Sequence, residues 1–102
     1  MGRSRSAVHS LVVLGIPKPT HRKAKDILRA AGLALLPTSN PHVKADLVKI
    51  HAGKQLSPIL LVRGNAMHGA RLQIADGYHR VCASYVTDEN TPIPCLLVSW
   101  QE

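Results

Sequence analysis

The sequence predicts a single α+β domain built on a small mixed sheet. Three observations favour this fold class. Short apolar runs of strand length alternate with segments that have helical periodicity, and glycines and prolines mark the joints between them. The 102 residues are long enough to bury a core, and 45% of them are apolar. Phenylalanine is absent, so we expect this core to be aliphatic.

The N-terminal residues 1–19 are expected to form a basic tail and a short apolar anchor before a single domain at 20–102. Within this segment, LVVLGI at 11–16 predicts a short buried strand or an apolar anchor that the following prolines end. The run is shorter than a membrane span, and no clear cleavage site follows it. We therefore expect neither a signal peptide nor contact with a membrane.

Thr20 predicts the N-cap of a first helix, which runs to about Ala31 and stops at Gly32. Its apolar face consists of Ala24, Ile27, Leu28 and Ala31. The run LALL at 33–36 then predicts a short strand, followed by a turn.

Asn40 before Pro41 predicts the start of a second helix, which runs to Ala52 and stops at Gly53. The helix has an apolar stripe of Val43, Leu47 and Ile50. It also has a polar stripe of His42, Asp46 and Lys49, spaced i, i+4, i+7. Such a helix can pack on a core and present polar groups to a neighbouring element.

The second half of the chain predicts a hairpin, a helix and a last strand. PILLVR at 58–63 and ARLQIA at 70–75 are strand runs around a loop at 64–69. A helix is expected at 77–86, and IPCLLV at 93–98 is the final strand.

Charge and cysteine content narrow the classes of function. Thirteen lysines and arginines against six acidic residues give a net charge of +7, which favours nucleotides, nucleic acids or acidic proteins as partners. Aromatic platforms for stacking single-stranded nucleic acid are missing.

Cys82 and Cys95 fall in predicted buried elements and are typical of reduced thiols in a cytoplasmic protein. The six histidines lack metal-ligand spacing, so no metal site is predicted.

The stretch IADGYHR at 74–80 is the candidate site, at the corner between a strand and a helix. Asp76 is suited to cap the helix, and Gly77 lets a ligand approach the backbone. The helix N-terminus, His79 and Arg80 all favour an anion such as phosphate. The residues alone equally fit a structural corner, in which Asp76 caps, Tyr78 packs and the two basic residues are solvated.

GKQLSPILLVRG, LQIADGYHRVCASY and IPCLLV resemble the ParB/sulfiredoxin superfamily over about residues 40–98. The resemblance implies a ParB/sulfiredoxin-like sheet flanked by helices, and a corner that binds ATP or another nucleotide, with or without Mg²⁺. The implied binding residues are Asp76, Gly77, Tyr78, His79 and Arg80, with His42 and Lys49 on the facing helix. Ala45 stands where sulfiredoxins have a polar residue on that helix.

Departures from the family pattern leave two functions open. Tyr78 stands where a sulfiredoxin has its catalytic cysteine, so sulfinic-acid reductase activity is not expected. The DNA-binding helix-turn-helix of ParB and the second phosphate motif of its CTP-using members have no counterpart. One hypothesis is a nucleotide-binding domain that carries out ATP-dependent phosphoryl transfer or nucleotide hydrolysis. The alternative is a non-catalytic regulatory module that binds nucleic acid non-specifically or a protein partner.

Overall fold

Four strands form one open sheet in the computed structural model, which describes residues 15–64 and 71–99. They are β1 (Lys18–Lys23), β2 (Ile59–Arg63), β3 (Gln73–Asp76) and β4 (Pro92–Ser99), in the spatial order β1-β4-β2-β3. The central strands β2 and β4 are parallel, and each edge strand is antiparallel to its neighbour. The α+β class with a mixed sheet is therefore confirmed.

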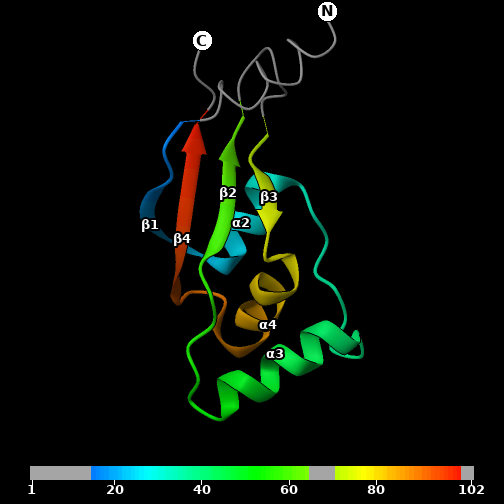
Figure 1. Ribbon diagram of the computed structural model, residues 1–102. Coiled ribbons are helices and arrows are strands. Elements are labelled where there is room, and N and C mark those ends of the chain that lie inside the picture. The colour runs from blue at the N-terminus through cyan, green and yellow to red at the C-terminus, as the bar shows by residue number, and fades with distance from the viewer. Residues whose placement is uncertain (1–14, 65–70, 100–102) are drawn as a thin grey trace, which may run out of the picture.

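Three helices accompany the sheet in this part of the chain: α2 (Ala24–Ala31), α3 (Pro41–His51) and α4 (Tyr78–Asp88). Figure 1 shows α2 behind the sheet and α3 beyond α4, away from the strands. Buried residues of β2 and β4 meet α2 and α4 in one aliphatic core: Ile27, Leu28, Ile59, Leu61, Val81, Cys82, Cys95 and Leu97. Val43 anchors α3 to the same core, so α3 is held against α4.

The expected helix from Thr20 is wrong at its beginning. Residues 18–23 form the edge strand β1, and α2 starts at Ala24 after Lys23, whose side chain makes no capping hydrogen bond. Thr20 pairs with Cys95, and this sheet pairing outweighs the local capping signal. Pro19 is tolerated because an edge strand has one side without a sheet partner.

The apolar run at 11–16 is only partly within the described residues, which begin at position 15. Ile16 is 85% exposed, so the expectation of a buried run is wrong at this position. The amide of Gly15 donates to the carbonyl of Ser99 over 2.9 Å. This contact places the start of the described chain beside the end of β4.

The end of α2 agrees with the prediction, but the strand expected at 33–36 is absent. Gly32 adopts a left-handed conformation with φ 66° and donates to the carbonyls of Leu28 and Arg29. The following segment has irregular structure. Its backbone instead bonds side chains of α4: Leu36 N donates to Cys82 Sγ, and Ala34 O accepts from the Tyr78 hydroxyl.

Helix α3 begins where the Asn40–Pro41 pair predicts. The side chain of Asn40 accepts hydrogen bonds from the amides of His42 at 2.9 Å and Val43 at 3.2 Å. Two otherwise unpaired donors of the first turn are thereby satisfied. The apolar stripe also packs as predicted, since Val43 is buried and Leu47 and Ile50 contact the core.

Replacing Asn40 with alanine is expected to lower the free energy of unfolding by about 1 kcal/mol, because both capping bonds are lost. Chemical denaturation followed by circular dichroism measures this change. Asn40→Asp retains a capping oxygen and should remain near the wild-type stability. Equal destabilisation by both substitutions would contradict the capping role.

The hairpin and the strand expected at 93–98 are found close to where the sequence places them, although β3 spans Gln73–Asp76 where residues 70–75 were expected. β2 pairs with β3, with an irregularity in register between Leu60 and Leu61, and β4 follows α4 as the final strand. The loop at 64–69 lies mostly outside the described residues. β3 leads through Gly77 directly into α4, which creates the strand-to-helix corner.

Candidate functional site

The corner between β3 and α4 turns at Gly77, which occupies the N-cap position with φ 107° and ψ 19°. This left-handed conformation favours glycine. The expected capping by Asp76 is wrong, because α4 has no side-chain cap. The Asp76 carboxylate instead accepts from Arg80 Nη2 over 3.3 Å, one helical turn further on. Within residues 15–64 and 71–99, no side chain caps the N-terminal amides of α4.

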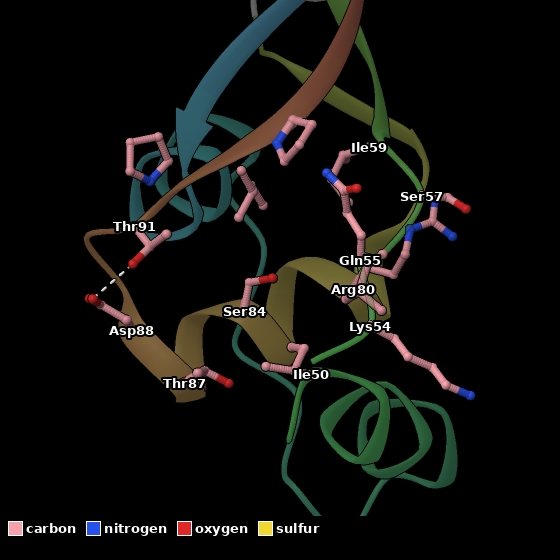
Figure 2. A pocket seen from close by; sticks show the side chains of 14 residues that line it. Ile50, Lys54, Gln55, Ser57, Ile59, Arg80, Ser84, Thr87, Asp88 and Thr91 are labelled. Atoms are coloured by element: carbon pink, nitrogen blue, oxygen red, sulfur yellow. Dashed lines mark hydrogen bonds between the residues drawn. The ribbon is translucent and has the colours of Figure 1, made fainter. Parts of the chain in front are cut away.

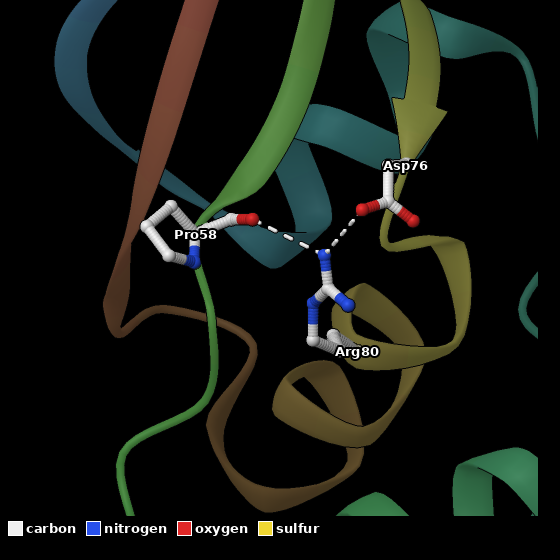
Figure 3. Close-up of polar contacts among 3 residues, drawn as sticks. All are labelled: Pro58, Asp76 and Arg80. Atoms are coloured by element: carbon white, nitrogen blue, oxygen red, sulfur yellow. Dashed lines mark hydrogen bonds and ion pairs between the residues drawn. The ribbon is translucent and has the colours of Figure 1, made fainter.

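Arg80 is fixed at the centre of the corner by two contacts that Figure 3 shows. Its Nη2 donates to the carbonyl of Pro58 over 3.1 Å and to Asp76 over 3.3 Å. Its Nε is buried and has no hydrogen-bond acceptor among the residues that the structure describes. A buried donor without a partner costs free energy, so the Arg80 guanidinium has hydrogen-bonding capacity that its described contacts do not use.

A cavity of about 260 Å³ lies between α3 and the corner, and we call it the polar cavity. Its lining consists of His42, Ala45, Asp46, Lys49, Asp76, Gly77, His79 and Arg80. The rings of His42 and His79 face each other across the two helices, with centroids 4.7 Å apart. The polar stripe of α3 and the corner, which are distant in sequence, therefore form one site.

The charges of the polar cavity are balanced. Lys49 Nζ lies 4.0 Å from Asp46, and Arg80 lies 3.3 Å from Asp76. Two cations thus face two carboxylates, with two imidazoles and the N-terminus of α4 beside them. This set offers donors for phosphate oxygens and also the carboxylate oxygens that Mg²⁺ prefers.

Two residues singled out in the sequence do not supply polar groups to this cavity. Tyr78 packs against the core, and its hydroxyl donates to Ala34 O. Ala45 lines the cavity with a methyl group only. The cavity therefore holds Asp76, Gly77, His79, Arg80, His42 and Lys49 of the predicted set, together with Asp46.

Cys82 lies one helical turn beyond the corner and is fully buried. Burial raises the pKa of its thiol, which favours the protonated and unreactive form. It is not part of the polar cavity. A thiolate nucleophile is therefore not available at the corner from this residue.

A second cavity, also of about 260 Å³, lies on the other side of Arg80, and we call it the apolar cavity. Figure 2 shows it between α4, the end of α3 and the segment that enters β2. The sequence did not predict this cavity, because its walls come from segments far apart in the chain. The carbonyl of Pro58 that anchors Arg80 was likewise not predicted, since no local pattern reveals the direction of a carbonyl.

No group of three or more histidine, cysteine, aspartate or glutamate residues is placed to hold a metal ion within 15–64 and 71–99. None of the helices in this part of the chain is long and apolar enough to cross a membrane.

No family model, curated protein or solved structure matches the chain.

Proposed function

We propose that the protein is a nucleotide-binding domain of ParB/sulfiredoxin type, which binds phosphates in the polar cavity at the 76–80 corner. One observation supports this proposal most strongly. The buried Nε of Arg80 has no acceptor in the described structure, although its guanidinium is already fixed by Pro58 and Asp76. A phosphate oxygen is the acceptor that best suits a guanidinium.

The other residues of the cavity have complementary roles in this proposal. Lys49 supplies a point charge, and His42 and His79 supply ring nitrogens as donors. Gly77 leaves room for the Arg80 side chain at the corner: a Cβ at this position would lie 2.8 Å from both Arg80 Nη2 and Ile59 Cδ1. The amides at the start of α4 add further donors, and the helix dipole favours negative charge there.

The two carboxylates favour a magnesium-bound nucleotide over a free one. The Asp76 side chain is 71% exposed, and one of its oxygens contacts Arg80. A bare phosphate would be repelled by this carboxylate, whereas Mg²⁺ on the phosphates would be attracted to it. Asp46, only 14% exposed, is the carboxylate of this cavity that is not paired with Arg80. It is the proton acceptor that we assign for ATP-dependent phosphoryl transfer or nucleotide hydrolysis.

Calorimetry with ATP, ADP and CTP, each with and without Mg²⁺, tests this function. We expect binding that is tighter with Mg²⁺. In Asp76→Asn the enhancement by Mg²⁺ should fall by about tenfold, because one charged ligand is removed. An absence of binding at millimolar nucleotide with Mg²⁺, in protein shown to be folded, would exclude the nucleotide site.

The Arg80–Asp76 ion pair also supports the second candidate, a non-catalytic module for nucleic acid or protein. In that case the guanidinium has only a structural role: it connects α4 with the residue before β2 and with the end of β3. A protein that binds no nucleotide but loses stability in Arg80→Ala would favour this candidate.

A further inference from the structure

The apolar cavity has the walls of a site for a flat, largely apolar group. Ile50 of α3, Ile59 of β2 and Ile93 of β4 line it, together with prolines at the start of β4. Ser84, on α4, is a polar member of the lining, and Figure 2 shows its hydroxyl turned toward the space between α4 and residues 54–57. Such a combination suits a heteroaromatic ring, which buries its faces and bonds at its edges.

Some polar groups of this lining are already engaged. The Thr87 hydroxyl donates to Ala83 O over 2.9 Å. The Asp88 carboxylate accepts from Asn90 N and from the Thr91 hydroxyl, and these bonds lower its pKa. The engaged groups shape the wall of the cavity, so we assign the polar contacts with a ligand to Ser84, Gln55 and Ser57, which also line it.

The apolar and polar cavities meet at one side chain. Arg80 lines both of them. The successive α3 residues Lys49 and Ile50 line the polar and the apolar cavity respectively. A Cβ on Gly77 would lie 2.8 Å from Ile59 Cδ1. Gly77 lines the polar cavity and Ile59 lines the apolar cavity, so the two linings are in close proximity here. A ligand that fills both would pass along the Arg80 guanidinium.

The sizes agree with a ligand shared between the cavities. Each measures about 260 Å³, which is below the roughly 300–1,000 Å³ of a site that encloses a whole small ligand. Together they fall within that range. One cavity offers phosphate donors and carboxylates, and the other offers apolar walls with a hydroxyl.

We propose that the apolar cavity binds the nucleoside part of the nucleotide whose phosphates lie in the polar cavity. This inference rests on the proposed function and adds a second subsite to it. Arg80, which lines both cavities, then lies between the base and the phosphates and contacts the ligand there.

Titrations of wild type with magnesium tripolyphosphate and with the magnesium complexes of ATP, GTP, CTP and UTP test the subsite. Tripolyphosphate requires only the polar cavity. We expect the best nucleotide to bind about tenfold more tightly than tripolyphosphate, because it also buries apolar surface. Ser84→Leu and the more exposed Thr87→Leu, which add bulk to the apolar cavity, should reduce nucleotide affinity to the tripolyphosphate level. Neither substitution should change the affinity for tripolyphosphate.

Val86→Leu is the matched control, because Val86 lies on the same helix, is exposed and does not line the apolar cavity. It should leave both affinities unchanged. The subsite is rejected if wild type binds tripolyphosphate as tightly as every nucleotide, or if folded Thr87→Leu and Ser84→Leu retain full nucleotide affinity. A wild type that binds neither tripolyphosphate nor nucleotide rejects the proposed function itself, and the subsite with it.

Discussion

Arg80→Ala is expected to weaken the binding of a magnesium-bound nucleotide by about 30-fold, or about 2 kcal/mol. This is the typical loss when a hydrogen bond to a charged group is removed. The side chain lines both cavities, and its Nε has no other acceptor among the described residues. Isothermal calorimetry on the nucleotide that binds wild type best gives the affinity change.

Two further substitutions separate the guanidinium fork from its charge. Arg80→Lys retains a positive charge but loses the planar donors, so we expect an intermediate affinity. Arg63→Ala removes an exposed arginine from β2 outside both cavities and should leave binding unchanged. A loss of affinity in Arg63→Ala equal to that in Arg80→Ala would show that only net charge matters.

Gly77→Ala is expected to lower both stability and nucleotide affinity. The φ of 107° is unfavourable for any residue with a Cβ, at a cost of about 1–3 kcal/mol. The added methyl group would also lie 2.8 Å from Arg80 Nη2 and from Ile59 Cδ1, so these side chains must move. Denaturant unfolding measures the first effect, and calorimetry on the folded variant measures the second.

Gly53→Ala provides a matched control for the backbone strain. Gly53 also has a positive φ, of 75°, but a Cβ there would meet no atom within 4 Å. We therefore expect a smaller loss of stability and an unchanged affinity. Equal effects of the two substitutions on both measurements would refute a special role for the space around Gly77.

Helices and strands whose ends are set by a few neighbouring residues were predicted well from the sequence. Asn40 and Pro41 define the start of α3, and the capping bonds of Asn40 explain why. The Asp-Gly pair at 76–77 marks the end of β3 and the start of α4, because Gly77 adopts the left-handed conformation in which the chain turns. The polar stripe of α3 was also recognised, because helical spacing alone places its side chains on one face.

Features that depend on distant partners could not be predicted in the same way. Thr20 has the local signal of a helix cap, but its pairing with Cys95 makes it part of a strand. Asp76 also has the local pattern of a helix cap, yet its carboxylate accepts a hydrogen bond from Arg80. The apolar cavity requires the simultaneous placement of α3, α4, β2 and β4, which no single stretch encodes.

The position of β4 in the sheet affects how the chain can fold during its synthesis on the ribosome. β4 follows the other three described strands in sequence, yet it is the partner of both β1 and β2. Among the described residues, β1 has no strand partner until residues 92–99 have been synthesised, and β2 and β3 form only a two-stranded hairpin, which is marginally stable in water. The nascent chain therefore exposes the apolar side chains of β2 until β4 has been synthesised. Assembly of this sheet therefore depends on β4, which pairs with β1 on one side and with β2 on the other.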